Sequence, residues 1–406
     1  MPNNKIVLYL SYDGLSDHIG QSQVLPYIVS CAERGIKFHL LTFEKAANTA
    51  KIQKIQELLD RHGIVWHRLE FTTGRSIRYK VQDFRKFVAK AFSITRRHRF
   101  AVIHSRSYIA SCVGYLVSRR FKVKQIFDKR DFWIDAVVET GRLKTSGLPH
   151  GPVYRGLRWF ERNLFEKSAH IISLTHRAKE VVLEKYPHRK AGDITVIPCC
   201  VDLSLFDPKA IPAPETEALR EKLGLQGSTV FGYVGSIGVA YMVNELLACF
   251  KAIKAKVPDA KLLFMVNNDR EEVLRTAESA GIPRTDVVVT SATRAEMPLH
   301  ISTLHYGLFF ITPTFAKQAT SPTKQYEMLA MGKTLITNAG VGDAEKIFGE
   351  LNCGYLLPAT NAAEYEKAAE WAAAQTPAPR TYDLSNYSLR FGAEHYFQVY
   401  QKLLSE

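Results

Sequence analysis

Lys324 and Glu327 stand near the start of a segment with a helical pattern, and their types and spacing suit the binding of a nucleotide. The segment runs from Ala319 to Gly332 and reads ATSPTKQYEMLAMG, so the Ser-Pro-Thr before Lys324 predicts a helix entry capped by Ser321 or Thr323. A cation in the first turn opposes the positive end of the helix dipole and is better explained by a bound phosphate. Glu327, about one turn later, could contact a ribose diol. The alternative is an ordinary surface Lys–Glu pair at i,i+3 spacing.

Two glycine-containing loops follow predicted strands and could present backbone N–H groups to an anion. The loop Ser11–Ser22 contains Gly20, where we expect a helix to open, and a second loop, Gly235-Ser-Ile-Gly238, follows a predicted strand at 230–234. Neither loop is a GxGxxG fingerprint, which disfavours a dinucleotide dehydrogenase. Plain turns and helix caps are the alternative interpretation.

A charged cluster, Asp128-Lys-Arg-Asp131, follows a predicted strand at 125–127. Asp131 could orient or deprotonate an acceptor hydroxyl. His104 ends the strand predicted at 102–104 and would face the same cleft. The alternatives are carboxylates that balance a helix dipole or pair with nearby cations, and a histidine that serves as a structural hydrogen-bonding group.

The elements that must position these residues alternate between short apolar runs and amphipathic segments, which predicts parallel sheets covered by helices. The alternation runs to residue 197 and restarts at 230, so we expect two consecutive doubly wound α/β domains, joined by the proline-rich linker Asp207–Glu217. The length of 406 residues agrees with two domains. Parallel sheets bind ligands in loops at the carboxyl ends of their strands, where the residues above lie.

Four stretches carry a family resemblance when they are taken together. They are the glycine loop in residues 12–26, the segment ITVIPCCVDLSLF at 194–206, the helix start at 321–332 and the loop NAGVGD at 338–343. Together they resemble the bacterial group 1 glycosyltransferases, glycosyltransferase family 4, whose GT-B fold has two facing Rossmann-like domains of doubly wound parallel sheet. The resemblance departs at 199–200, where Cys-Cys replaces the usual Asn-Gly.

The resemblance implies an N-terminal acceptor-binding domain (1–205), a C-terminal nucleotide-sugar-binding domain (206–384), and a C-terminal helix (385–406) that crosses back onto the first domain. It implies transfer of a sugar with retention, from a UDP- or GDP-sugar to a glycan or lipid-linked acceptor. Neither a metal nor a resident cofactor is expected. The implied donor-binding residues are Gly20, Gln21, Gly235, Ser236, Ser321, Pro322, Thr323, Lys324 and Glu327.

The residues expected at the reaction centre are Lys324, Glu327, Arg130, Asp131 and His104. Glu327 matches the second glutamate of the family's E-x7-E motif, whereas Ala319 replaces the first, and the family's Arg…Lys phosphate clamp is missing after Gly235. Lys324 and Arg130 are therefore the expected cations for the diphosphate, because fixed positive charge stabilises such a leaving group.

Positive charge is concentrated in the first half of the chain, where residues 1–200 hold 35 basic and 17 acidic residues. Nine of the basic residues lie between Arg75 and Arg99, interleaved with apolar residues at helical spacing. This pattern is typical of a basic amphipathic helix that lies on anionic lipid. The alternative is a sheet-covering helix with a solvated outer face. No nucleic-acid-binding module accompanies the charge, so we expect no nucleic-acid partner.

The six cysteines form no CxxC pair, no apolar run is long enough to span a membrane, and no signal-peptide region is apparent. We therefore expect a cytoplasmic protein. The family resemblance, together with the basic first half of the chain, implies a peripheral position on the inner face of the plasma membrane and a function in surface polysaccharide or lipopolysaccharide biosynthesis. Two alternatives stay open, namely a nucleotide-sugar epimerase or hydrolase of the same fold, and a degenerate non-catalytic glycan- or nucleotide-binding module.

Overall fold

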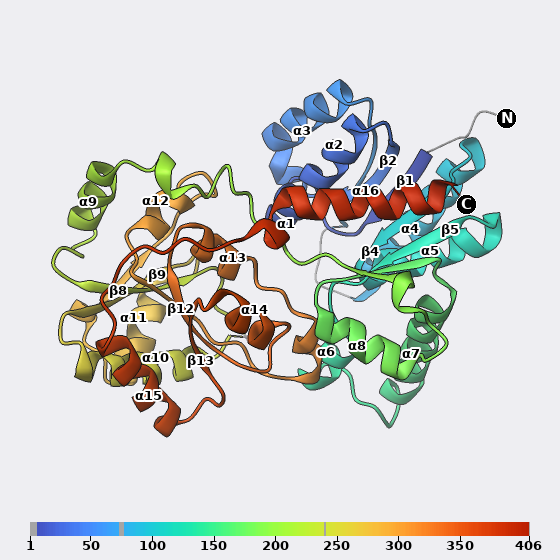
Figure 1. Ribbon diagram of the computed structural model, residues 1–406. Helices are drawn as coiled ribbons and strands as arrows, with labels where there is room; N and C mark the ends of the chain where they lie inside the picture. Colours follow the sequence, from blue (N-terminus) through green and yellow to red (C-terminus); the bar gives the residue numbers. More distant parts are fainter. Residues whose placement is uncertain (1–5, 73–76, 239–240, 406) are drawn as a thin grey trace. The chain divides into compact units, whose positions relative to one another are not determined.

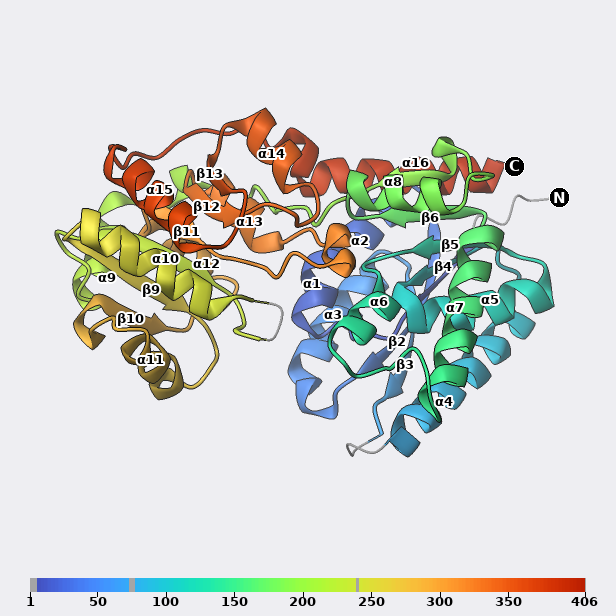
Figure 2. The same cartoon turned by 90° about the horizontal axis from the view of Figure 1, so that it is seen from below.

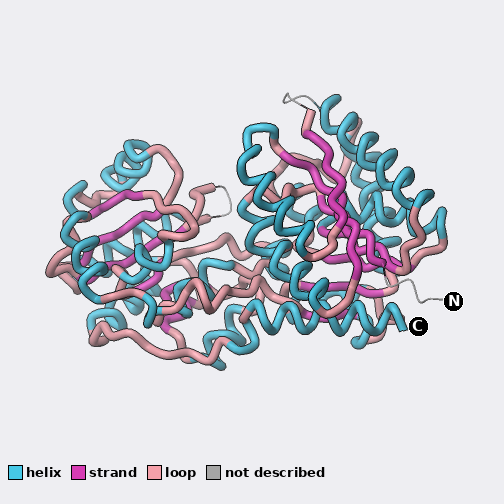
Figure 3. Tube along the Cα trace, turned by 90° about the horizontal axis from the view of Figure 1, so that it is seen from above, coloured by secondary structure: helices cyan, strands magenta, loops and turns pink. Residues whose placement is uncertain are grey.

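The computed structural model describes residues 6–72, 77–238 and 241–405, and the chain forms two compact units (Figure 1). Unit 1 comprises residues up to 199 together with 389–406, and unit 2 comprises residues 200–388. Each unit contains a parallel β-sheet with helices packed on it, and Figure 3 shows the strands (magenta) enclosed by helices (cyan).

The sheet of unit 1 has seven parallel strands in the order β3-β2-β1-β4-β5-β6-β7. The strands are β1 (Ile6–Ser11), β2 (Lys37–Glu44), β3 (Val65–Glu70), β4 (Val102–Arg106), β5 (Lys124–Asp128), β6 (His170–Ser173) and β7 (Ile194–Val196). The α-helices are α1 (His18–Gln23), α2 (Leu25–Glu33), α3 (Thr49–Arg61), α4 (Ile77–Arg97), α5 (Ser107–Phe121), α6 (Trp133–Glu139), α7 (His150–Lys167), α8 (His176–Lys185) and α16 (Leu389–Ser405).

The sheet of unit 2 has six parallel strands in the order β10-β9-β8-β11-β12-β13. The strands are β8 (Thr229–Val234), β9 (Ala260–Met265), β10 (Val287–Thr290), β11 (Tyr306–Leu308), β12 (Thr334–Asn338) and β13 (Gly354–Leu357). The α-helices are α9 (Ala213–Lys222), α10 (Val243–Lys256), α11 (Arg270–Ser279), α12 (Met297–Ser302), α13 (Thr323–Ala330), α14 (Ala344–Leu351) and α15 (Ala362–Ala373).

Helices cover both faces of the sheet in unit 1. Figure 2 shows α4, α5 and α7 on one side of the strands and α2 and α3 on the other. Adjacent residues of β4 illustrate the alternation, because His104 contacts Tyr400 of α16 whereas Ser105 lies against Gly114 of α5. The core under α4 and α5 consists of aliphatic and aromatic side chains from β1, β2, β4 and these two helices.

The predicted linker Asp207–Glu217 is wrong. This stretch lies inside unit 2, where Pro208–Ala210 is a short 3-10 helix and α9 begins at Ala213. Its prolines mark helix starts, because a proline in the first turn loses no hydrogen bond. The chain instead passes from unit 1 into unit 2 between Cys199 and Cys200, and it returns to unit 1 between Ser388 and Leu389.

The helix predicted from the basic stretch is α4, and Arg75 lies outside the described residues. Phe87 and Ala91 on its inner side are fully buried in the core, while Lys80, Arg85 and other basic residues are exposed. The apolar face of α4 therefore covers the sheet, as the alternative interpretation has it. Among the described residues, no helix has the length and apolarity to cross a membrane.

Candidate functional site

Lys324 lies in the first turn of α13, and its ammonium group is buried in unit 2. The Nζ atom lies 4.0 Å from the ring centroid of Tyr233 and 4.0 Å from that of Tyr241. It has no hydrogen-bond partner among the described residues. Burial lowers the pKa of Lys324 to about 7, and the nearby carboxylate of Glu327 offsets part of that effect. A buried ammonium with unused donors is well suited to receive a phosphate oxygen.

Gly235 makes room for this ammonium. It directly follows β8 with a φ of +102°, and a Cβ added at this position would lie 3.4 Å from Lys324 Nζ. A glycine adopts such a φ without strain, whereas other residues rarely do. The loop after β8 therefore brings backbone, rather than a side chain, up to the lysine.

Glu327 is buried one turn after Lys324 and forms an ion pair with Arg294. The Arg294 Nη1 atom donates to Glu327 Oε1 at 3.2 Å. Burial raises the pKa of Glu327, while the charges of Arg294 and Lys324 oppose this rise. The alternative interpretation, a surface Lys–Glu pair, is therefore wrong, because both side chains are buried and Glu327 pairs with Arg294 instead.

Arg294 was not predicted from the sequence. It lies in the loop after β10, which is an edge strand of the sheet in unit 2. Its guanidinium is 5.6 Å from the ring centroid of Phe206. Its side chain is 25% exposed, so part of its donor capacity remains accessible to solvent. A polar loop following a strand was the available signal, but no local pattern connected it with Glu327.

The other predicted residues around α13 and β8 have structural contacts of their own. The N-cap position of α13 is Pro322, so the prediction that Ser321 or Thr323 caps this helix is wrong. Ser321 is buried, with Oγ 3.3 Å from Tyr326 Oη. The carbonyl of Ser236 accepts a hydrogen bond from Tyr233 Oη at 2.7 Å.

The loop after β8 is tied to the loop after β9. The Ile237 N–H donates to Asn268 Oδ1 at 3.0 Å, and the Gly235 N–H donates to the Met265 carbonyl at 3.0 Å. These bonds hold the glycine loop at the carboxyl edge of the sheet. Residues 239 and 240 lie outside the described residues, and α10 begins at Val243.

Gly20 and Gln21 serve the fold of the first loop in unit 1. The helix α1 begins at His18, so the prediction that Gly20 opens it is wrong. A Cβ on Gly20 would lie 2.2 Å from the Gly14 carbonyl oxygen, which means that close packing requires glycine here. Gln21 Nε2 donates to the Ser16 carbonyl at 3.0 Å.

Glu44, the last residue of β2, holds the same loop. Its carboxylate accepts hydrogen bonds from the backbone N–H groups of Leu15 at 2.7 Å and Ser16 at 3.1 Å. The carboxylate at the end of the second strand is therefore engaged with the protein backbone. A dinucleotide-binding domain would use such a group on a ribose, whereas Glu44 holds the loop of its own chain.

Two arginines converge on Gln23 at the carboxyl edge of the sheet in unit 1. Arg106, the last residue of β4, donates to Gln23 Oε1 at 3.0 Å and to Asp13 Oδ2 at 2.8 Å. Arg130 donates to the same Gln23 oxygen at 2.9 Å and to Asp128 Oδ1 at 3.2 Å. Because Asp13 is 40% exposed, the Arg106–Asp13 pair is the part of this cluster that solvent reaches. Neither Gln23 nor Asp13 was predicted as a site residue.

His104 is fully buried, so the expectation that it faces a cleft is wrong. Its Nδ1 atom lies 2.6 Å from Tyr400 Oη, and its Nε2 atom lies 3.3 Å from Asp128 Oδ2. Burial lowers the pKa of His104, and its hydrogen bond to Asp128 opposes this effect. Burial would raise the pKa of Asp128, yet the Arg130 charge and His104 hold it below its usual value. His104 therefore belongs to a buried network beneath α16.

Asp131 lies next to a fully buried lysine. The Nζ atom of Lys129 is 3.7 Å from the ring centroid of Phe132, and burial lowers the pKa of Lys129 to about 7 while Asp131 opposes this effect. Arg130 also contacts α16, because its Nη1 atom lies 3.4 Å from Tyr396 Oη. In unit 1 the structure thus brings Arg130 and His104 together through Asp128, and in unit 2 it brings Lys324, Glu327 and Gly235 together.

No group of three or more His, Cys, Asp and Glu side chains in the described ranges has an arrangement that could hold a metal ion. The polar clusters of the two units consist mainly of cations, hydroxyls and amides. Such groups can hold phosphate, carboxylate or sugar hydroxyls through hydrogen bonds.

Comparison with known proteins shows what this arrangement resembles. Residues 28–205 match the sequence model of Glycosyltransferase Family 4, and no curated protein matches the chain. The Anabaena protein HepE, solved with UDP and glucose, has 13% identity and a TM-score of 0.63 over 98% of this chain and 97% of its own.

Two further solved structures have similar coverage. Sucrose-phosphate synthase from Thermosynechococcus elongatus has 16% identity and a TM-score of 0.69, covering 98% of this chain and 99% of its own. WaaG, a glycosyltransferase involved in lipopolysaccharide biosynthesis, has 14% identity and a TM-score of 0.63, covering 98% of both chains.

The two parallel-sheet units therefore form a GT-B fold, as the sequence predicted. Residues 28–205 match the model of Glycosyltransferase Family 4, and this match confirms the resemblance of the chain to the group 1 glycosyltransferases.

Proposed function

We propose that this protein transfers a sugar, with retention at the anomeric carbon, from a UDP- or GDP-sugar to a glycan or lipid-linked acceptor. The observation that carries the proposal is the position of Lys324 and Glu327, both buried, on one turn of α13. The ammonium has no partner among the described residues, and the carboxylate is held by Arg294. These are the two groups needed to hold a diphosphate and a ribose at one helix start.

Lys324 would stabilise the leaving diphosphate. Breaking the bond between sugar and phosphate places negative charge on the phosphate oxygens, and a fixed ammonium in a water-poor site stabilises this charge strongly. Glu327 would accept hydrogen bonds from the ribose hydroxyls, with Arg294 favouring its ionised form. Gly235 and Ser236 would allow the phosphates to approach the backbone. The transfer would need no metal ion, which titrations in EDTA would test.

Unit 1 would bind the acceptor. Its sheet edge presents Arg106 with the partly exposed Asp13, and Asp131 follows the adjacent strand. These carboxylates could orient an acceptor hydroxyl or receive its proton. Arg130 would act by holding Gln23 and Asp128 in place.

The proposed pathway is the assembly of a surface polysaccharide or lipopolysaccharide, for which the acceptor would be presented at a membrane. Support comes from the excess of basic residues in unit 1 and from the exposed charges of α4. WaaG, whose name states a role in lipopolysaccharide biosynthesis, is one of the structural neighbours. We place the protein in the cytoplasm, peripheral to the inner face of the plasma membrane.

A titration with nucleotides tests the proposal. Purified protein would be titrated by calorimetry with UDP, GDP, ADP and CMP, with and without magnesium, beside the Glu327→Ala variant. Saturable binding of one diphosphate without magnesium, weakened in the variant, is the expected result. Failure to bind any nucleotide would favour a non-catalytic module.

Turnover assays separate the enzymatic alternatives. Incubation of the matching nucleotide-sugar with membrane extract should give sugar transfer only when an acceptor is present. The product's anomeric configuration, read by NMR, should equal that of the donor. Acceptor-independent release or epimerisation of the sugar would instead indicate a hydrolase or epimerase. One structural neighbour, from Listeria monocytogenes, is described as a putative UDP-N-acetylglucosamine 2-epimerase.

A further inference from the structure

Basic residues are concentrated in the helices that cover one face of the sheet in unit 1. The helices α4, α5 and α7 together contain thirteen basic and three acidic residues. On the opposite face, α2, α3 and α16 contain five basic and four acidic residues. Figure 2 shows α4, α5 and α7 beside one another, so their charge forms one basic face. An anionic surface is the natural partner of such a face.

Large apolar side chains are exposed on the same layer. The described residues contain nine exposed large hydrophobic side chains, and five of them lie on or just before these helices. These five are Val81 on α4, Leu116 on α5, Leu148 before α7, and Val153 and Trp159 on α7. Since the inner side of α4 is used in the core, α5 and α7 supply most of the apolar groups that could contact a partner.

Four neighbouring side chains form what we name the α5–α7 patch: Tyr115, Leu116, Trp159 and Phe160. The ring centroids of Tyr115 and Phe160 are 5.3 Å apart, and those of Trp159 and Phe160 are 5.9 Å apart. Tyr115 Oη also donates to Asn163 Oδ1 at 3.1 Å, which fixes the two helices against each other. Trp159 is 60% exposed and Leu116 is 37% exposed. The patch is therefore preformed and presents an indole ring to solvent.

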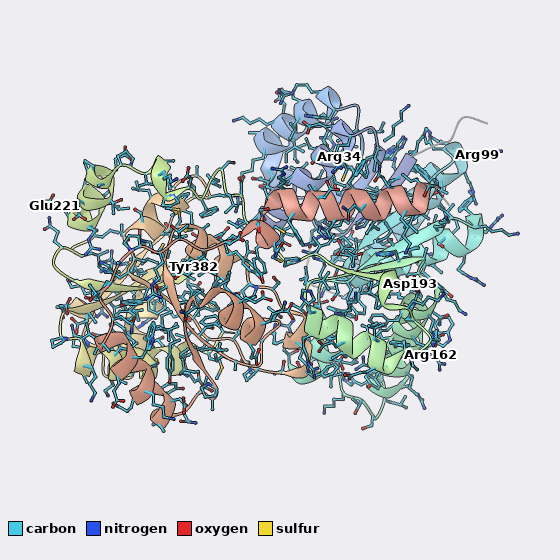
Figure 4. The ribbon with its side chains drawn as sticks, in the orientation of Figure 1. Arg34, Arg99, Arg162, Asp193, Glu221 and Tyr382 are labelled. Atoms are coloured by element: carbon cyan, nitrogen blue, oxygen red, sulfur yellow. The ribbon has the colours of Figure 1, made fainter. Side chains whose placement is uncertain are left out.

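Arginines surround the α5–α7 patch. Arg155 precedes Trp159 by four residues and Arg162 follows it by three, so both lie on the same side of α7 as the indole. Arg119 and Arg120 end α5, three and four residues after Leu116. Within the described part of the chain, Arg119, Arg120 and Arg155 form no ion pair, while Arg162, labelled in Figure 4, pairs with Glu166 and is 68% exposed.

We propose that the α5–α7 patch docks on a membrane of anionic lipid, with Trp159 at the boundary between headgroups and acyl chains. An indole ring suits this boundary because it is apolar with one hydrogen-bond donor. The flanking guanidiniums bind lipid phosphates while their stems cover apolar surface. The inference builds on the proposed function, since an enzyme that uses a lipid-linked acceptor must reach the bilayer. The sequence pattern assigned the apolar contact with the membrane to α4, whereas this inference assigns it to α5 and α7.

Tryptophan fluorescence tests the depth of insertion in the full-length protein. The probes are vesicles of phosphatidylcholine alone, vesicles with about one-third phosphatidylglycerol, and both with brominated acyl chains. Trp159 is the exposed tryptophan, because Trp66 is buried and Trp133 and Trp371 are half-buried. We expect bromine quenching with the anionic vesicles and its loss in Trp159→Phe. Binding without quenching, or quenching unchanged in Trp159→Phe, would overturn the assignment.

Vesicle sedimentation tests the charge. Because each arginine near an anionic surface contributes about 1 kcal/mol, the double variant Arg119→Gln, Arg155→Gln should weaken partitioning about thirtyfold. The control is Val65→Thr, an exposed apolar residue on β3, which should bind as the unaltered protein does. Equal partitioning of the double variant and the control would refute the proposal, as would equal binding to neutral and anionic vesicles, which would show that anionic lipid is not recognised.

Nucleotide titration of the same variants separates this inference from the proposed function. The variants change residues of unit 1, whereas α13 belongs to unit 2, so UDP or GDP affinity should not change. Vesicle docking with no nucleotide binding would refute only the transferase proposal, and nucleotide binding with no docking would refute only this inference.

Discussion

Replacing Lys324 with methionine should weaken nucleotide binding and at the same time stabilise the ligand-free protein. Methionine keeps most of the length of the unbranched side chain, which is shorter by one heavy atom, and removes the ammonium that lies against Tyr233 and Tyr241. A hydrogen bond from an ammonium to a phosphate contributes about 1.5–3 kcal/mol. The Kd of the bound diphosphate should therefore rise about 10- to 150-fold.

The gain in stability follows from the pKa of Lys324, which burial lowers from 10.5 to about 7. Between these values the unfolded chain holds the proton and the folded protein does not, so the free energy of unfolding rises with pH, by about 1.4 kcal/mol per unit at most. The free-energy cost of burying the charged ammonium is complete below pH 7 and disappears above pH 10.5. At pH 7 the Lys324→Met variant should therefore be more stable by a few kcal/mol, and this advantage should shrink as the pH rises.

Urea denaturation between pH 6.5 and 9 measures the stability, and calorimetry in two buffers of different ionisation enthalpy measures the binding. Phosphate should raise the pKa of the lysine, so the unaltered protein should take up a proton on binding near pH 8 and the variant should not. Lys333→Met is the matched control, because Lys333 is also buried, with a pKa lowered to about 8, but donates to the Ser302 carbonyl at 2.9 Å. A Lys324→Met variant that binds normally and is less stable would refute the reasoning.

Three further changes give expected outcomes. Arg294→Gln should raise the pKa of Glu327, so that nucleotide binding weakens about tenfold near neutral pH and recovers as the pH rises. Arg294→Lys should restore part of the lost affinity. The control is Arg284→Gln, which changes an exposed arginine of the same unit and should have no effect in the same titrations. Gly20→Ala should destabilise the protein by about 1–3 kcal/mol in urea denaturation, because its Cβ would meet the Gly14 carbonyl; an unchanged midpoint would show that the loop relaxes freely. Tyr400→Phe should cost about 1–3 kcal/mol by leaving a nitrogen of His104 unpaired, and a stability equal to the unaltered protein would contradict the network.

The periodicity of the sequence was sufficient for the two parallel sheets, because buried parallel strands and covering helices leave regular apolar patterns. Lys324 and Glu327 could also be predicted as neighbours, since three residues of one helix determine their spacing. Arg294 could not be, because its contact with Glu327 spans 33 positions and depends on the loop after β10 meeting helix α13. The same limit applies to Gln23 and Asp13, which reach Arg106 across 83 and 93 positions.

The errors have physical reasons too. The prediction ended a strand at His104, where side chains often face ligands, but β4 continues to Arg106 and α16 returns from far along the chain to cover His104. The linker prediction relied on prolines, which break helices in their interior yet open them at the first turn, as in α9. Pattern alone also left the apolar side of α4 undecided between core and membrane, and only the packing of Phe87 and Ala91 decides it.

The discontinuity of unit 1 has a consequence for biosynthesis on the ribosome. Its buried polar groups, His104 and Asp128, receive their phenol partners only from Tyr400 and Tyr396 of α16. Translation must therefore pass through all of residues 200–388 before the first-made unit can complete its interior. Unit 2 is continuous in the chain and faces no such delay. A nascent chain stalled before residue 389 would hold a closed second unit and a first unit that is still open to chaperones and proteases.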